Sequence, residues 1–222
     1  MTLALCVVGN GRLDYLHRAV VAAMNHLPIH HFDHFLMVDD SGDPNVGREL
    51  ARTYPDWYLT HHGDNQGMAA AVQTGFDMCR TIDASFVFWL EEDMLLTRTP
   101  PVIEAVETLA EQPDLAQICF RREPVDVNPT EMANNCVLKT LCDQSTIIRQ
   151  HDMWTEYDGL FSLNPCVIPC DVIAAGWDPG NEAGMTSKLV AQGYTFGSWG
   201  HPGDGQSWVR HIGHQRGAKW QL

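Results

Sequence analysis

The sequence has no apolar run approaching the roughly 18 to 20 residues that a membrane-spanning helix needs. Its first residues, MTLALCVVGNGR, have no basic segment ahead of their short apolar run, which is atypical of a secretion signal. We therefore expect no membrane span and a cytoplasmic protein, in which Leu3 to Val8 forms a first strand.

Basic residues are also scarce, since 14 Lys and Arg oppose 28 Asp and Glu and give a formal net charge of −14. This balance argues against broad electrostatic capture of DNA, RNA or anionic membranes, which draws on clustered Lys and Arg. It leaves room for a local basic channel. An acidic protein that acts on a phosphorylated substrate must offset its own field at the site, and a bound metal ion does so directly.

The seven cysteines form no regular framework, and the chain contains no internal repeat or low-complexity tract. An odd count without paired spacing argues against a disulfide scaffold and favours reduced thiols. The spacings from Cys136 to Cys142 and from Cys166 to Cys170 differ from the close pairs of a structural zinc site. A small domain held together by disulfides or zinc is therefore not expected.

What the sequence does contain is a regular alternation of apolar runs and helical stripes. Strands are predicted for Leu3 to Val8, Phe35 to Val38, Trp57 to Leu59 and Phe86 to Leu90. Helices are predicted from Leu13 to Leu27, Pro44 to Tyr54, Met68 to Cys79, Pro100 to Glu111 and Glu182 to Gln192. This order predicts one Rossmann-like α/β domain over residues 1–222, with a mostly parallel central sheet flanked by helices.

A polar cluster follows each predicted strand. The four clusters are Gly9 to Arg12, Asp39 to Asp43, Asn65 to Gly67 and Glu91 to Asp93. Because ligands of such sheets bind beyond the carboxyl ends of the strands, we expect the clusters to share one crevice. After Phe120 the periodicity fades, and residues 121–159 are expected to be an irregular lid or acceptor-side region.

Glu91, Glu92 and Asp93 directly follow the most apolar of the predicted strands. Three adjacent carboxylates repel one another unless a cation or solvent compensates. Hard oxygen ligands suit Mg²⁺ or Mn²⁺, and these ions commonly bridge a carboxylate and the phosphates of a substrate. The position after a buried strand therefore favours a metal site over a solvated acidic turn.

Four motifs occur in the order known from one family: VVGNGRLDYL at 7–16, LMVDDSGD at 36–43, NQGMAAAVQTGF at 65–76 and FVFWLEEDMLL at 86–96. Over about the first 100 residues the chain resembles the nucleotide-sugar glycosyltransferases of the GT-A fold, family 2-like. The resemblance implies a nucleotide-sugar and metal half at 1–100, and an acceptor half with a C-terminal tail at 101–222. It also implies an inverting, Mn²⁺- or Mg²⁺-dependent transfer from a nucleoside diphosphate sugar, most simply a UDP-sugar, to an acceptor hydroxyl.

The same resemblance assigns roles to individual residues. In that family an Asp-x-Asp motif binds the metal and the donor, and here Glu91-Glu92-Asp93 stands in its place with Glu first. Asp93 would then be the principal metal ligand. The donor contacts implied are Asn10, Arg12, Asp39, Asp40, Asn65, Gly67, Glu91 and Glu92.

Two residues of the second half complete the site that the resemblance implies. His211, within WVRHIGH, resembles the late histidine that completes the metal site in many GT-A enzymes, and His214 is the second choice. Glu182, within GWDPGNEAGMTSKL, matches the family's place for the base that deprotonates the acceptor. A carboxylate that only stabilises a helix start is the alternative role for Glu182.

Other functions remain open at this stage. Nucleotidyl transfer to a sugar phosphate also pairs a metal with a nucleotide, and a non-catalytic nucleotide-sugar-binding protein would explain Glu91 in place of Asp. The acceptor could be a glycan, a small molecule, a protein or a modified base in DNA. The DNA option rests on the local basic residues Arg121, Arg122, Lys139 and Arg149.

Overall fold

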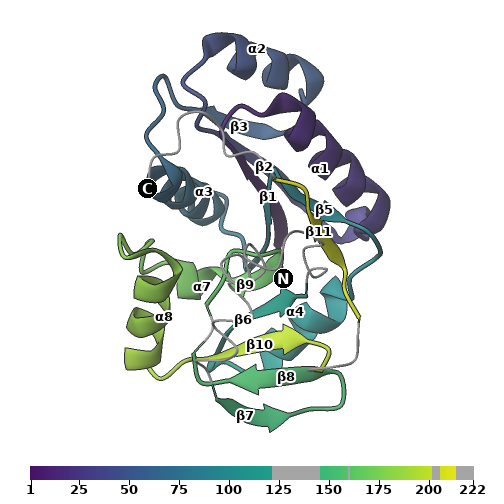
Figure 1. The fold of residues 1–222 in the computed structure, drawn as a ribbon, viewed down its shortest axis with the longest axis vertical. Coiled ribbons are helices and arrows are strands. Elements are labelled where there is room, and N and C mark those ends of the chain that lie inside the picture. The colour runs from purple at the N-terminus through teal and green to yellow at the C-terminus, as the bar shows by residue number, and fades with distance from the viewer. Residues whose placement is uncertain (122–145, 160, 202–205, 214–222) are drawn as a thin grey trace, which may run out of the picture.

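The computed structural model describes residues 1–121, 146–159, 161–201 and 206–213. One nine-stranded sheet runs through the molecule in the order β3-β2-β1-β4-β9-β6-β10-β8-β7 (Figure 1). Its strands are β1 (Leu3–Gly9), β2 (His34–Asp39), β3 (Tyr58–His61), β4 (Phe86–Glu91), β6 (Leu115–Phe120), β7 (Ile147–Gln150), β8 (Trp154–Tyr157), β9 (Cys166–Pro169) and β10 (Thr195–Trp199). A separate two-stranded ribbon pairs β5 (Met94–Leu96) with β11 (Val209–His211).

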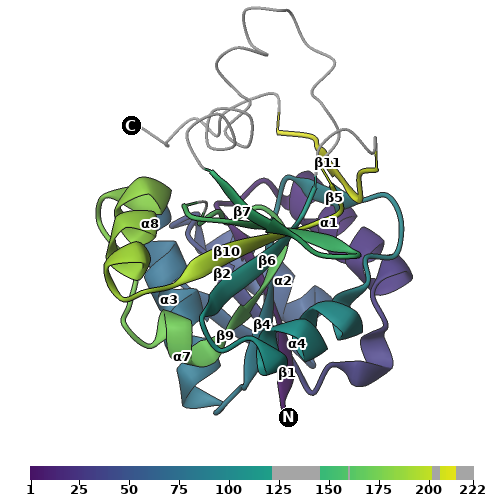
Figure 2. The same cartoon turned by 90° about the horizontal axis from the view of Figure 1, so that it is seen from below.

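Helices cover both faces of the sheet (Figures 1 and 2). They are α1 (Leu13–His26), α2 (Pro44–Thr53), α3 (Met68–Thr81), α4 (Val102–Glu111), α7 (Cys170–Ile173) and α8 (Asn181–Ala191), with a short 3₁₀ helix at Ile29–His31. Helices α1, α2 and α4 supply residues to one core cluster, and α3, α7 and α8 supply residues to the other. The predicted α/β fold with a central sheet flanked by helices is confirmed.

The central strand β4 explains why its sequence is apolar without interruption. Phe88 and Leu90 belong to the α1 and α4 side of the core, whereas Val87 and Trp89 belong to the α3 and α8 side. A strand buried on both faces needs apolar side chains at every position. Close packing also fixes Gly75 on α3, because a Cβ there would lie 2.8 Å from the Trp89 ring.

The sheet is parallel in its first half and mixed in its second. Strands β3, β2, β1 and β4 all run parallel, as the predicted βαβ alternation requires. Strand β9 then runs antiparallel between β4 and β6, and β8 and β7 continue the antiparallel pairing beyond β10. The sheet therefore includes strands from both halves of the chain.

Strands of the second half depart from the expectation that residues 121–159 are irregular. Both β7 and β8 lie in that stretch, while residues 122–145 are outside the described part of the chain. These strands are only four residues long and pair with distant segments, so their sequence lacks the period that marks a longer strand. The short strands β5 and β9 were not predicted for the same reason, and β6 and β10, of six and five residues, were also not predicted.

The carboxyl ends of the first parallel strands are level with one another. In the register of the sheet, Gly9 pairs with Asp39, and Val8 pairs with Glu91. The β5–β11 ribbon lies at this end of the molecule, opposite the N-terminus (Figure 2). Within the described residues, no helix is both long and apolar enough to cross a membrane.

Candidate active site

The four predicted polar clusters meet at this edge of the sheet. Gly11 lies against Ser41, since a Cβ on Gly11 would approach the Ser41 side chain to 2.6 Å. Gly42 lies in the same way against the Asn65 backbone. Both glycines have positive φ values, +96° and +67°, which side chains disfavour. The expectation that the clusters converge is therefore confirmed.

Glu92 anchors the acidic turn to the loop after β1. Its side chain is 2% exposed, and Oε1 accepts a 2.6 Å bond from Nε of Arg12. Oε2 accepts a 3.1 Å bond from the backbone N–H of Asn10. Burial raises the pKa of Glu92 to about 7, although Arg12 and the Asn10 N–H both act to lower it.

Asp93 lies between two cationic or potentially cationic groups. Its Oδ2 accepts a 2.9 Å bond from Nη2 of Arg12 and lies 3.4 Å from Nε2 of His211. Burial alone would raise the pKa of Asp93, but His211 and Arg12 together outweigh it and lower the pKa. The lowered pKa favours the ionised form of Asp93, whose carboxylate lies beside His211; their role as metal ligands stays a prediction.

The β5–β11 ribbon is what brings His211 to Asp93. His211 pairs with Met94 across the ribbon, and the N–H of Ile212 donates a 2.8 Å bond to the carbonyl of Asp93. A Cβ on Gly213 would collide with the Asp93 carboxylate, so only glycine permits this approach. His214, the second choice from the sequence, lies outside the described residues.

Asp93 and His211 fit a divalent ion whose remaining ligands come from a substrate. Among the described residues, no group of three or more His, Cys, Asp or Glu side chains is arranged to bind a metal alone. Asp93 and His211 offer one carboxylate and one imidazole, a combination that suits Mn²⁺ and is tolerated by Mg²⁺. Both ions commonly take only one or two protein ligands when phosphate oxygens complete the shell.

Asp39 and Asp40 are fully buried, and their carboxylates form hydrogen bonds with other groups of the protein. Asp39 accepts bonds from the N–H and hydroxyl of Ser41 and lies 2.7 Å from Nδ1 of His61. Asp40 lies 2.7 Å from Nδ1 of His62. Direct donor contacts by these two aspartates therefore stay a prediction, whereas their part in shaping the adjacent loops is visible in the structure.

Asp40 also fixes the loop that leads into α3. Its two oxygens accept 2.8 Å bonds from the N–H groups of Gln66 and Gly67. The side chain of Asn65 donates to the Asp40 carbonyl at 2.5 Å. Gly67 has φ of +88°, and a Cβ there would meet no atom within 4 Å, so its backbone faces open space at the helix start.

Glu182 lies in the first turn of α8. Its Oε1 accepts a 2.7 Å bond from the N–H of Leu163 and a 3.0 Å bond from the hydroxyl of Ser162. Burial raises the pKa of Glu91 well above its usual range, and the charges of Asp93, Glu182 and Glu92 act in the same direction. The charge of Glu182 therefore acts on the carboxylate of Glu91 at the end of β4. The preceding Asn181 has a positive φ of 63°, a strained conformation of the kind found at functional sites.

Of the four basic residues named for acceptor binding, the structure describes two. Arg121 donates a 2.7 Å bond to the carbonyl of His201, and Arg149 is exposed on the edge strand β7. Arg122 and Lys139 lie outside the described residues. These positions leave the chemical class of the acceptor undefined.

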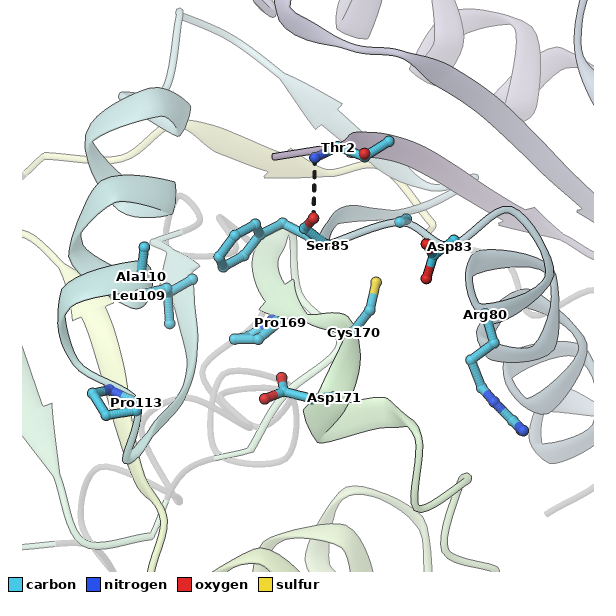
Figure 3. Close-up of a pocket in the computed structure, with 12 residues that line it drawn as sticks. Thr2, Arg80, Asp83, Ser85, Leu109, Ala110, Pro113, Pro169, Cys170 and Asp171 are labelled. Carbon is cyan, nitrogen blue, oxygen red and sulfur yellow. Dashed lines mark hydrogen bonds between the residues drawn. The ribbon is translucent and has the colours of Figure 1, made fainter.

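A cleft of about 720 Å³ lies at the opposite, amino-terminal edge of the sheet (Figure 3). Ser85 and Asp83 line it from the turn before β4, and Cys170 and Asp171 line it from α7. Thr2 donates a 3.1 Å backbone bond to the Ser85 hydroxyl at its rim. None of the predicted site residues lines this cleft, so we assign the chemistry to the carboxyl edge.

Several residues that shape the candidate site were not identified from the sequence. They are Ser162, Leu163, Asn164, His61 and His62. The histidines follow a strand that was predicted, so a polar pair after that strand was an available signal. The segment from Ser162 to Asn164 carries no such mark, because its partner Glu182 lies on a separate helix.

Comparison with protein-family models and with curated proteins gives no match. Solved structures do match. The mannosyltransferase PcManGT from Pyrobaculum calidifontis, in complex with GDP-Man and Mn²⁺, is 17% identical, with a TM-score of 0.61 over 97% of this chain. TarS 1-349 from S. aureus is 10% identical, with a TM-score of 0.63 over 96% of this chain, and its complex with UDP-GlcNAc also gives 0.63.

At these identities the matches show the fold. The chain spans 58% of the PcManGT chain and 60% of the TarS chain, so each of those proteins is considerably longer than the part that it shares with this chain. The chain has the GT-A-like fold of nucleotide-sugar glycosyltransferases, and the resemblance drawn from its motifs is confirmed at that level.

Proposed function

We propose that this protein transfers a glycosyl unit from a nucleoside diphosphate sugar to an acceptor hydroxyl, with a divalent cation and with inversion at the anomeric carbon. The observation that carries the proposal is the approach of Asp93 to His211 at the carboxyl edge of a GT-A-like sheet. No histidine lies on β4 or β5, which flank Asp93, and no carboxylate lies on β11 with His211. Two distant segments of the chain are brought together to form this pair.

Asp93 and His211 would hold Mn²⁺ or Mg²⁺ together with the diphosphate of the donor. When bound, the ion stabilises the negative charge that develops on the departing diphosphate. Arg12 contributes a fixed positive charge beside the same carboxylate, and its planar guanidinium suits phosphate oxygens. Glu92 positions Arg12 through the 2.6 Å bond to Nε.

The donor would bind across the loops that follow β1, β2 and β3. This edge is bordered by Asn10, Asn65 and Gly67. The buried residues Asp39 and Asp40 stabilise the loops through hydrogen bonds to Ser41, Asn65 and Gly67. The backbone at the start of α3 favours an anionic group. The complexes of PcManGT with GDP-Man and of TarS with UDP-GlcNAc support a nucleoside diphosphate sugar as donor, and a UDP-sugar is the first to test.

Glu182 is proposed as the base that takes the proton of the acceptor hydroxyl. Its charge acts to raise the pKa of Glu91 at the acidic strand end, which supports a place for Glu182 near the proposed donor site. Deprotonation by Glu182 would let the acceptor displace the diphosphate directly, and a single displacement inverts the configuration of the sugar. The acceptor itself, whether a glycan, a small molecule, a protein or a modified DNA base, is left to a screen.

The test is the Glu182→Gln variant, which keeps the shape of the side chain and removes the base. We expect turnover to fall by about 10² to 10⁴ while donor affinity barely changes. A residue that only stabilises the start of α8 would instead cost up to about 1 kcal/mol of stability and leave turnover intact. Near-parental turnover with a lowered melting temperature would contradict the assignment.

A further inference from the structure

Ser162 occupies a buried turn between β8 and β9, directly beneath the start of α8. It is 0% exposed, and all of its polar groups are bonded. Its backbone N–H donates to Oε1 of Gln117 at 3.3 Å, and its carbonyl accepts from the Cys166 thiol at 3.5 Å. Strands β6 and β9 therefore hold the backbone of Ser162, and this fixes the position from which its hydroxyl extends.

The partners of the Ser162 hydroxyl determine where its proton points. Glu182 as an ionised carboxylate can only accept, so the 3.0 Å contact requires the single hydroxyl proton of Ser162. Asn164 must then present its NH₂ group to Ser162 Oγ, and it does so at 2.6 Å. The backbone N–H of Asn164 donates to the same oxygen at 3.3 Å. These two donors occupy both lone pairs of Ser162 Oγ, so its contact with Glu182 uses the hydroxyl proton.

Asn164 has an unusual feature that this arrangement explains. Its Oδ1 is buried and finds no hydrogen-bond partner among the described residues. Leaving such an oxygen unpaired costs stability, and an unpaired buried group calls for an explanation. Turning the amide over would pair that oxygen with the Ser162 proton, but it would take this proton away from Glu182 and leave the amide NH₂ unpaired instead. The observed orientation thus favours the contact to Glu182.

From these contacts we infer that Ser162, oriented by Asn164, is a positioning residue for the base Glu182. This inference rests on the function proposed above. The Ser162 hydroxyl and the Leu163 N–H both bind Oε1, so they hold that oxygen of the carboxylate in place at the start of α8. A carboxylate that is already oriented loses less conformational freedom when it accepts the proton of an acceptor hydroxyl. Ser162 itself contacts neither donor nor acceptor in this account.

The test measures release of nucleoside diphosphate from UDP-GlcNAc or GDP-mannose with Mn²⁺, in the full chain. We expect Ser162→Ala to lower kcat on the order of 10-fold, as for loss of a hydrogen bond to a charged group, with the donor KM unchanged. Combining Ser162→Ala with Glu182→Gln should add no further loss, because Ser162 acts only through that carboxylate. An additive loss in the double variant would overturn the inference.

Two further variants separate positioning from folding. Thr186→Val is the matched control, because Thr186 anchors the same turn through a 3.1 Å bond from the Phe161 N–H and bonds the backbone carbonyl of Glu182, at 2.7 Å, rather than its carboxylate. It should lower the melting temperature and spare kcat. Asn164→Leu removes both the orienting amide and the unpaired oxygen, so kcat should fall while the melting temperature is retained or raised.

The outcomes distinguish this inference from the proposed function. A Thr186→Val variant as slow as Ser162→Ala, or an Asn164→Leu variant with parental kcat, would overturn the inference. If Glu182→Gln is slow and Ser162→Ala is not, the inference alone fails. If Glu182→Gln itself keeps parental turnover, the assignment of the base fails and the inference fails with it.

Discussion

Nε2 of His211 lies 3.4 Å from Oδ2 of Asp93, although one residue follows β4 and the other ends β11. We predict that His211→Ala weakens Mn²⁺ binding by at least about 10-fold, because ligand-shell losses are typically of this size or larger. Calorimetry with UDP present measures the dissociation constant. His30→Ala, at an exposed position of the 3₁₀ helix, is the matched control.

His214 provides an internal comparison for that prediction. It lies outside the described residues, and the sequence places it second to His211. We expect His214→Ala to weaken Mn²⁺ binding less than His211→Ala. Equal and negligible effects of the two substitutions would remove the C-terminal tail from the metal site.

Arg12 donates a 2.9 Å bond to Oδ2 of Asp93, the carboxylate proposed to hold the metal. Replacing Arg12 by Met should therefore strengthen Mn²⁺ binding to the donor-free protein, by about fivefold if the ion pair contributes about 1 kcal/mol. The same change should weaken UDP binding in the presence of metal, since a phosphate-binding cation is lost. Binding of Mn²⁺ followed by electron paramagnetic resonance, with Arg48→Met as control, measures the first effect. Weaker metal binding in both conditions would show that Arg12 supports the site rather than competing with the ion.

The raised pKa of Glu92 predicts a pH dependence of stability. Its pKa is about 7 in the folded protein against a usual 4.5, so the folded state binds more protons between these values. The contribution of Glu92 to the free energy of unfolding must then fall as pH rises from about 4.5 to about 7, by up to about 3 kcal/mol. Urea unfolding of the metal-free protein and of Glu92→Gln across this range measures the two slopes. Parallel pH profiles would mean that Glu92 ionises normally.

The first half of the site could be predicted because it depends on local order along the chain. Asp93 follows an apolar strand, and Arg12 and Gly67 follow others, so the rule that parallel strands end at one edge brings them together. Asp39 and Asp40 were found in the same way, but their full burial could not be foreseen. That burial depends on His61 and His62, whose partners become apparent only when β2 and β3 pair.

The second half of the site depends on contacts between distant segments. His211 was identified through the family resemblance, since nothing in its neighbourhood predicts the pairing of β11 with β5. Ser162 was missed because a serine in a short turn has no pattern of its own. Strand β9 was missed because four residues inserted antiparallel between β4 and β6 show neither a period nor a length that marks a strand.

The central claim is transfer from a nucleoside diphosphate sugar that depends on a metal held by Asp93. The most direct measurement is to incubate the chain and its Asp93→Asn variant with UDP-GlcNAc or GDP-mannose, with Mn²⁺ or with a chelator, and to identify the nucleotide released. The account predicts UDP or GDP from the parent with Mn²⁺, and a loss of most of this activity with chelator or in Asp93→Asn while the melting temperature is retained. Release of a nucleoside monophosphate or pyrophosphate, or diphosphate release that is indifferent to Mn²⁺ and to Asp93, would contradict it.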